Sequence, residues 1–366
     1  MPASDHGHQH RGTALSIFSR SAPPTIGLDI GNSSVKLLQL SRAGSGYRVE
    51  HLAIESLPEG AFAEHGINNV DEVGTAIRSA IKRSGTKARH CAMAVSGSAV
   101  ITKLIHLPGD LAEDEIEGQI EVEAGQYIPY PRDEVSLDFQ ILGKSARNAD
   151  VVEVLLAASK TEYIETRQAV AELAGLTARI IDVEANAIAN AFELVRLRDG
   201  IPDSSVIAVL DIGEVRSSLN VMRGDRSIYY RDHPFGGREL IEETMRRYGL
   251  DAEQAQFWKR REEPPAGFED EVLEPYRQGV IQQIGRALQF YSSSREYASI
   301  NTLYLAGGGA SATGLVEAVA SELGINAELA DPLKSVKLAP RINAGQIDLV
   351  RPSLVTACGL ALRGVE

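Results

Sequence analysis

One strand-and-turn pattern occurs twice in the chain, once near its start and once past its middle. Residues 26–31 read I-G-L-D-I-G and residues 208–213 read A-V-L-D-I-G, each an apolar run that ends in Asp, one apolar residue and Gly. Each copy continues with a small polar cluster, an apolar run, a Gly turn and another apolar run. Each half of the chain is therefore predicted to open with three strands joined by tight hairpins. An internal repeat of this length predicts a duplicated α/β fold.

The turn that follows each Asp suits phosphate. A strand that ends in Asp-x-Gly and doubles back through Ser or Asn presents backbone N–H groups and hydroxyls in a concave nest. Gly31 and Gly213 would let the backbone approach a ligand closely. Asp29 and Asp211 could hold Mg²⁺ through water, since that ion prefers water plus one or two carboxylates. One such hairpin alone is more simply explained by an Asx-type turn. Two matched copies predict a clamp around the phosphates of a nucleotide.

Composition places the chain among ordinary globular proteins and excludes some functions. Its 366 residues are enough for two lobes with a core each, and 43 % are hydrophobic. The net charge of −13 argues against a nucleic-acid binder, because neutralising phosphates needs a basic face. Cys91 and Cys358 are the only cysteines, far apart, which fits a reducing cytoplasm and gives no zinc site.

The N-terminal segment and the hydropathy profile give no membrane span. No stretch reaches the roughly 20 apolar residues that cross a bilayer. Residues 1–24 are polar and end in two prolines, so we expect a disordered tail. His6, His8 and His10 in that tail could bind a metal adventitiously, but a solvated tail accounts for them better.

A change in the residue pattern near residue 101 predicts an insertion. Residues 110–123 carry seven acidic residues in fourteen and suggest a helix with an acidic outer face, which the prolines near residue 130 end. Residues 135–141 alternate as a half-buried strand does, residues 151–158 form another, and residues 161–174 suggest a helix. The expected arrangement is an αββα insertion whose sheet has one face open to solvent or to a partner. The acidic helix face is read as solvated surface, with a partner contact as the alternative.

A third candidate element lies near the C-terminus. A strand predicted over residues 302–305 runs into Gly307, Gly308 and Gly309, then Ser311, before a helix. Glycines between a strand end and a helix N-terminus let a flat ligand or a phosphate reach the backbone. The sequence holds no P-loop, Rossmann fingerprint or serine-hydrolase elbow. Two phosphate hairpins followed by a Gly-rich loop favour a nucleotide site.

These elements, in this order, resemble the actin, hexokinase and chaperone ATPase superfamily. The closer resemblance is to the family of type IV pilus assembly proteins PilM, relatives of the cell-division protein FtsA, and it runs from about residue 25 to 365. The stretches that carry it are 26–40 (IGLDIGNSSVKLLQL), 235–240 (FGGREL), 280–290 (VIQQIGRALQF), 305–311 (LAGGGAS) and 357–363 (ACGLALR).

The resemblance implies an actin-like ATPase fold: two duplicated ribonuclease H-like lobes, with an FtsA-type inserted subdomain in the first. The boundaries that it implies are a tail over 1–24, the first-lobe core over 25–100, the insertion over 101–176, a return to the first lobe over 177–200, the second lobe over 205–350, and a C-terminal helix over 351–366 that rejoins the first lobe.

The resemblance also implies a function. Family members are cytoplasmic, bind ATP with Mg²⁺, and dock the N-terminal cytoplasmic tail of the inner-membrane protein PilN beside the insertion, which links the alignment complex to the pilus motor ATPases. Contact with the membrane would come only through that partner. Whether ATP is hydrolysed stays open, with at most slow turnover expected. The oligomeric state also stays open, with a homodimer as one alternative.

Carried over residue by residue, the resemblance assigns a nucleotide site. Glu184, on the helix that connects the lobes, is where the superfamily positions a polar group that orients water. Asp29 and Asp211 would hold the metal through water. The residues that would bind the nucleotide are Asp29, Gly31, Asn32, Ser33, Ser34 and Lys36 in the first hairpin, Asp211, Gly213, Ser217 and Ser218 in the second, Gly237, Arg238 and Glu242 near the ribose or base, and Gly307, Gly308, Gly309 and Ser311 in the adenosine loop.

The second hairpin departs from the family pattern. Glu214 and Arg216 stand where the family has small residues and Ser or Thr. A carboxylate beside phosphates is repulsive unless it points away, pairs with Arg216 or meets the metal. Two alternatives to an ATP-binding adaptor therefore stay open: a small-molecule kinase or phosphatase of the same superfamily, and a filament-forming relative of actin.

Overall fold

Two sheets with the same strand order form the body of the molecule. The computed structural model describes residues 25–63, 66–145, 148, 150–259, 265–294 and 297–365, so the expected tail and its histidines lie outside the described residues. In the first sheet the described strands lie in the order β10 (Thr177–Val183), β6 (His90–Val95), β1 (Thr25–Ile30), β2 (Ser34–Ala43), β3 (Gly46–Ser56) and β16 (Lys337–Leu338).

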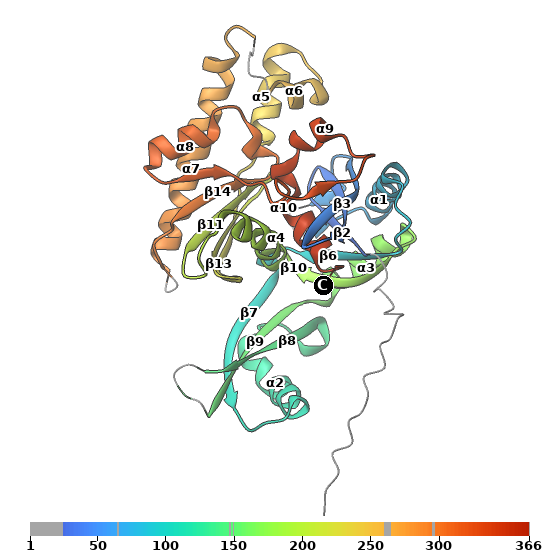
Figure 1. The fold of residues 1–366 in the computed structure, drawn as a ribbon, viewed down its shortest axis with the longest axis vertical. Coiled ribbons are helices and arrows are strands. Elements are labelled where there is room, and N and C mark those ends of the chain that lie inside the picture. Colours follow the sequence, from blue (N-terminus) through green and yellow to red (C-terminus); the bar gives the residue numbers. More distant parts are fainter. Residues whose placement is uncertain are drawn as a thin grey trace, which may run out of the picture.

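The second sheet repeats this arrangement. Its described strands lie in the order β13 (Arg226–His233), β12 (Ser217–Arg223), β11 (Val206–Ile212), β14 (Thr302–Ala306) and β15 (Ala327–Leu329). In both lobes three antiparallel strands are followed by strands parallel to the first, so β11 corresponds to β1 and β12 to β2. The predicted duplication is confirmed, and Figure 1 shows the two sheets side by side.

Two helices lie between the lobes. They are α4 (Glu184–Asp199) and α10 (Val355–Leu362), and Figure 1 shows both at the centre of the molecule. A single core of buried side chains joins them to both sheets, for example Phe192, which packs edge-on against Tyr304 of β14 with ring centroids 5.0 Å apart. The two helices approach so closely that a Cβ on Gly359 would overlap the carbonyl oxygen of Ala187. Glycine at this position is therefore a condition of the packing.

Other helices cover the outer faces of the two sheets, α1 and α3 on the first and α5, α7 and α8 on the second. On the first lobe α1 begins at the N-cap Asn69, whose side chain accepts a hydrogen bond from the backbone N–H of Glu72, and ends at Gly85 in the left-handed region. Helices α5, α7 and α8 pack on the second sheet. The bounds are α1 (Val70–Ser84), α3 (Thr161–Leu173), α5 (Arg238–Tyr248), α6 (Ala252–Trp258), α7 (Glu274–Ser292), α8 (Leu315–Leu323) and α9 (Ala344–Asp348), with a short hairpin of β4 (Phe62–Ala63) and β5 (Gly66–Ile67).

The insertion projects away from both lobes, at the bottom of Figure 1. It consists of an antiparallel sheet in the order β7 (Val100–Pro108), β9 (Val151–Lys160) and β8 (Val135–Lys144), with α2 (Glu113–Tyr127) packed on one face. The buried side chains between α2 and the sheet include Ile116, Ile120, Val154 and Leu156.

The expected αββα arrangement is wrong in two respects. A third strand, β7, pairs with β9 along its whole length. Helix α3 belongs to the first lobe, because its residues Val170 and Ala171 are buried in the first-lobe core beside Val73 and Ile77 of α1. Helix α2 packs on one face of this sheet, and no helix among the described residues packs on the other, as the alternation of β8 predicts.

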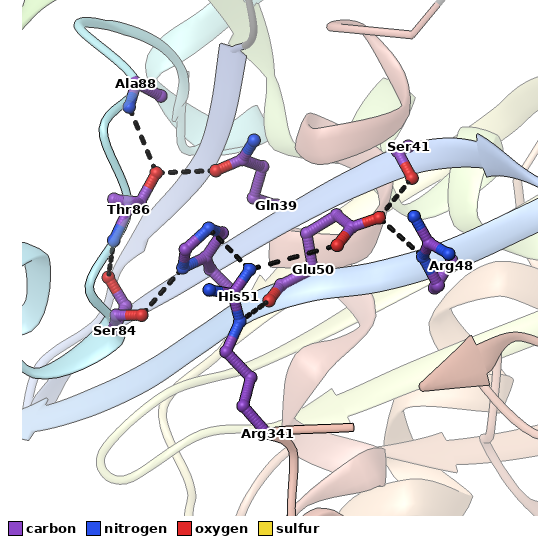
Figure 2. A network of polar contacts seen from close by, with 9 residues as sticks. All are labelled: Gln39, Ser41, Arg48, Glu50, His51, Ser84, Thr86, Ala88 and Arg341. Atoms are coloured by element: carbon purple, nitrogen blue, oxygen red, sulfur yellow. Dashed lines mark hydrogen bonds and ion pairs between the residues drawn. The ribbon is translucent and has the colours of Figure 1, made fainter. Parts of the chain in front are cut away.

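A segment inside the range expected for the second lobe, residues 205–350, pairs with the first lobe instead. Strand β16 pairs in parallel with β3, which the sequence does not predict. Arg341, just beyond it, donates from Nε to the carbonyl oxygen of Glu50 over 2.8 Å and lies 2.9 Å from Nε2 of His51. Nδ1 of His51 lies 2.7 Å from the carbonyl oxygen of Ser84 and so must donate to it, which leaves Nε2 to accept from Arg341 (Figure 2).

Candidate functional site

The two Asp-x-Gly turns have the same hydrogen bond. The backbone N–H of Gly31 donates to the carbonyl oxygen of Ser34 over 3.0 Å, and that of Gly213 donates to the carbonyl oxygen of Arg216 over 3.0 Å. Asp29 and Asp211 are each the second-last residue of the strand that opens their lobe, two positions before the Gly of the turn. The sequence match is thus also a match of local geometry.

The first hairpin brings a cation to its carboxylate. Nζ of Lys36 lies 2.8 Å from Oδ2 of Asp29, and the two residues face each other across β1 and β2. Burial by itself lowers the pKa of Lys36, but the surrounding carboxylates, Asp29 first, outweigh burial and raise it. The side chains of Asn32, Ser33 and Ser34 hydrogen-bond no other residue in the described part of the chain, so their polar groups are open to solvent or to a ligand.

Charged groups from both lobes act on one another across the region between the two hairpins, which we call the cleft. Lys36 of the first lobe acts on the pKa of Asp211 in the second, and Glu184 of α4 feels both Asp211 and Asp29. Burial raises the pKa of Asp211 to about 6, with Lys36 acting against the shift. Burial raises the pKa of Glu184 to about 7, with Arg216 acting against it. Carboxylates that hold protons near neutral pH are common at functional sites.

The hydroxyls of the second hairpin are already engaged within the protein. Oγ of Ser217 donates to the carbonyl oxygen of Phe235 over 2.7 Å, and the Ser218 hydroxyl acts against the rise in the pKa of the Tyr230 phenol. Tyr230 in turn donates to Oε2 of Glu184 over 3.1 Å. The second turn therefore offers a ligand backbone N–H groups and the side chain of Arg216, in place of hydroxyls.

The two residues that depart from the family pattern point to different partners. Glu214 lies 3.5 Å from Nη2 of Arg238, at the start of α5, and its carbonyl oxygen accepts from the Arg238 N–H over 2.8 Å. Arg216 instead pairs with Glu184 and Asp232. Glu214 thus points away from Arg216, and Arg238 neutralises it. Glu242 lies exposed one helical turn beyond Arg238.

The Gly-rich loop closes one side of the cleft. Gly307 has a φ of +85°, and a Cβ there would overlap Oδ1 of Asp211. A Cβ on Gly237 would lie 3.3 Å from Cα of Gly309, so this loop and the start of α5 are almost in contact. Oγ of Ser311 is buried and has no hydrogen-bond partner among the residues that the structure describes. A buried unsatisfied hydroxyl costs roughly 1–3 kcal/mol, which a ligand hydrogen bond would offset.

Sequence patterns do not single out three residues that the fold places here. Lys259 ends α6, is buried, and donates from Nζ to the carbonyl oxygen of Gly308 over 3.0 Å. Tyr230 and Asp232 lie on one face of β13, opposite β12 residues of the phosphate hairpin. A strand prediction over β13 would have placed Tyr230 and Asp232 on the same face, because side chains two residues apart point the same way. Nothing in the sequence distinguishes Lys259 from a surface lysine.

Contacts between the residues that follow β6 and the strand β13 join the two lobes. Oγ of Ser96, at the end of β6, donates to Oδ2 of Asp232 over 3.1 Å. A Cβ on the neighbouring Gly97 would lie 2.5 Å from Cδ1 of Tyr230, so the ring packs directly on that backbone. Together with α4 and α10, these contacts hold the two hairpins opposite each other.

The residues present fit Mg²⁺ and a nucleotide. No group of three or more His, Cys, Asp or Glu side chains among the described residues could hold a metal ion by itself. Mg²⁺ does not need one, because phosphates and water supply most of its ligands in nucleotide sites. Asp29 and Asp211 are the carboxylates that would approach it, and the Ser311 hydroxyl and the Gly-lined loop suit the nucleoside end. The bound ion would neutralise phosphate charge in a cleft with several acidic groups.

Comparisons with known proteins agree with this architecture. The family model for "Type IV pilus assembly protein PilM" matches residues 27–365. A solved structure of the PilM-PilN type IV pilus biogenesis complex is similar, with 30 % identity, 93 % of this chain and 98 % of that chain covered, and a TM-score of 0.76. The ethanolamine utilization protein EutJ from Carboxydothermus hydrogenoformans shares the fold, with 17 % identity, coverage of 93 % and 89 %, and a TM-score of 0.51. The fold is that of the actin-like ATPases. No described helix combines the length and apolarity needed to traverse a bilayer.

Proposed function

Because the chain belongs to the family of type IV pilus assembly protein PilM, we propose that it is an adaptor of the type IV pilus machinery. It binds ATP with Mg²⁺ between its lobes and docks the N-terminal cytoplasmic segment of PilN on the side of the insertion. The observation that carries the proposal is the similarity to the chain of the PilM-PilN complex, which extends over nearly all of both chains and so includes the insertion.

The cleft supports the ATP-binding part of the proposal. Asp29 and Asp211 approach from opposite lobes, with Lys36 between them as a cation. The orphaned hydroxyl of Ser311 and the close approach of Gly237 to Gly309 mark the nucleoside side. Bound nucleotide would contact both lobes and so stabilise their closed arrangement by mass action.

The uncovered face of the insertion sheet supports the docking part. Helix α2 covers the face that carries Ile105 and Val154, so the alternate residues lie on the other face. Leu104 is 49 % exposed there and lies directly across from Leu155 of β9. His106 and Glu153 follow on the same face, 3.8 Å apart. An apolar pair beside a polar pair suits a short peptide with alternating side chains.

The place of the protein in the cell follows from the partner. We propose that it works on the cytoplasmic side of the inner membrane, held there by PilN, and that it passes conformational changes between PilN and the motor ATPases. The cysteines fit a reducing compartment, since Cys91 and Cys358 are both buried thiols.

The docking proposal is tested with a fluorescent peptide of the PilN cytoplasmic segment. Leu104→Ser should weaken its binding about tenfold, because one buried leucine contributes roughly 1.5–3 kcal/mol. Val122→Ser is the matched control, since Val122 is 77 % exposed on α2, on the opposite side of the insertion. Equal affinities of Leu104→Ser and the parent would place the peptide elsewhere, and no binding by the parent would refute the partner.

The ATP proposal is tested by Mg²⁺-dependent retention of nucleotide on the full chain. Asp211→Ala and Asp29→Ala should each abolish it while the circular dichroism spectrum stays that of the parent. Phosphate release separates the kinase alternative, since a kinase turns over at about 1 s⁻¹ or faster. Sedimentation with ATP separates the filament alternative, because a filament pellets and an adaptor does not.

A further inference from the structure

The Arg216 guanidinium is held in the cleft by charge rather than by hydrogen bonds. Its Nη1 lies 3.5 Å from Oδ2 of Asp232, and its Nη2 lies 3.7 Å from Oε2 of Glu184. Both distances exceed the 2.7–2.9 Å of a charge-assisted hydrogen bond. The guanidinium donates no hydrogen bond to any residue in the described ranges, although the side chain is only 29 % exposed. Its donors thus lie beside the two carboxylates without a hydrogen bond to another residue in the described ranges.

Each hairpin supplies one cation to the cleft, from a different position. In the first hairpin Lys36 stands across from Asp29, and in the second the residue across from Asp211 is Ser218. The cation of the second hairpin is Arg216, whose carbonyl oxygen closes the turn as that of Ser34 does in the first. Since the Ser217 hydroxyl is engaged by the Phe235 carbonyl oxygen, Arg216 is the charged side-chain donor that this turn offers.

We propose that Arg216 distinguishes a nucleoside triphosphate from a diphosphate, by exchanging Asp232 and Glu184 for the terminal phosphate. The inference rests on the proposed binding of ATP and goes beyond it by assigning the selectivity to one side chain. A guanidinium presents a planar fork of N–H donors that matches phosphate oxygens bidentately, and such bonds are stronger than the loose pairs seen here.

The exchange leaves neither carboxylate without a partner. Asp232 keeps the hydrogen bond from Ser96, and Glu184 keeps the one from Tyr230, both at 3.1 Å. Removal of one member of a buried pair is costly mainly when the other charge is left alone. Because each carboxylate has a second donor, Arg216 can leave at a lower cost than in an isolated ion pair.

The test compares affinities for the Mg²⁺ complexes of ADP and of the non-hydrolysable analogue AMPPNP by calorimetry, on the full chain. The parent should prefer AMPPNP by about tenfold or more, the equivalent of one charge-assisted hydrogen bond. Arg216→Gln should bring the two affinities within about threefold by weakening AMPPNP alone. Arg216→Lys should recover part of the preference, since charge remains and the fork is lost. Arg223→Gln, at the exposed far end of the strand that follows Arg216, should leave the ratio unchanged.

Three results overturn the inference. If Arg216→Gln keeps the parental ratio of AMPPNP and ADP affinities, another residue accounts for the preference for the triphosphate. If Arg216→Gln weakens both nucleotides equally, Arg216 contributes only general affinity. If the parent binds neither nucleotide, the proposed ATP site fails together with this inference, whereas the first two results leave that site standing. Thermal unfolding of each variant verifies that it is folded.

Discussion

Lys36 and Asp29 face each other across β1 and β2, with Nζ of the lysine 2.8 Å from Oδ2 of the aspartate. Both side chains are only 16 % exposed. The lysine also acts on Asp211 from the opposite lobe, so one ammonium group serves two carboxylates that would otherwise repel each other across the cleft. The charge of Lys36 therefore acts on the carboxylates of both hairpins.

Lys36→Met should destabilise the nucleotide-free protein by about 3 kcal/mol, because it leaves a mostly buried carboxylate without its cation. Asp29→Asn in the same background should restore part of the loss, since the unpaired charge is then gone. Urea unfolding of the parent, the two single variants and the double variant measures the coupling. Strictly additive effects would show that the pair contributes no interaction energy.

Gly359→Ala should destabilise the fold by more than about 4 kcal/mol or prevent folding, because the new Cβ would overlap the carbonyl oxygen of Ala187 and force α4 and α10 apart. Gly279→Ala is the matched control: it lies in α7, and a Cβ there meets no atom within 4 Å. The control should gain up to about 1 kcal/mol from helix propensity. Thermal unfolding distinguishes the two, and similar melting temperatures would contradict the close helix packing.

The sequence predicts the parts of the fold that depend on local pattern. The two hairpins follow from apolar runs that end in Asp-x-Gly, and α1 follows from helical spacing closed by Gly85. Strand β7 escapes prediction because Thr102 and Lys103 interrupt its alternation, and only pairing with β9 makes it a strand. The two-residue strand β16 has no local signal at all.

The candidate site likewise contains residues that local sequence patterns predict and residues whose partners only the packing determines. The Asp, Gly and Ser residues of the turns carry their own sequence signal. The partners of Glu214 and Arg216 do not, because Glu214 turns toward Arg238, and Arg216 toward Glu184 and Asp232. Two residues that are close in sequence thus point to opposite sides of the hairpin, and only the packing of α4 and α5 around the turn decides which partner each one meets.

Stability should fall between pH 5 and pH 8 through the Glu184 carboxyl. Burial raises its pKa from an ordinary value of 4.5 to about 7, so in this range the folded state holds a proton that the unfolded state has lost. This stabilisation is fully present below the pKa of Glu184 in the unfolded chain and disappears as the pH rises through its pKa in the folded protein. It amounts to on the order of 2 kcal/mol. Glu184→Gln cannot lose a proton and should show a flatter profile.

Urea unfolding of the parent and of Glu184→Gln at pH 5 and pH 8 measures this difference. Asp211, whose pKa burial raises to about 6, contributes in the same direction in both proteins, so the Glu184→Gln profile keeps a residual slope. A parental profile as flat as that of Glu184→Gln would show that Glu184 is ionised across the range and that the cleft is wetter than its burial indicates.

Arg341→Met should loosen the segment that crosses from the second lobe to the first. The variant loses the hydrogen bonds to the Glu50 carbonyl oxygen and to Nε2 of His51, at a cost of about 1.5 kcal/mol (Figure 2). The amide of Ala339, which donates to the carbonyl oxygen of Val49 over 2.9 Å, should exchange faster with solvent, while the amides of β11 keep their protection. Hydrogen exchange read by mass spectrometry resolves the two regions. Arg226→Met, at the exposed end of β13, is the control, and parental exchange of Ala339 in Arg341→Met would mean that β16 is held by strand pairing alone.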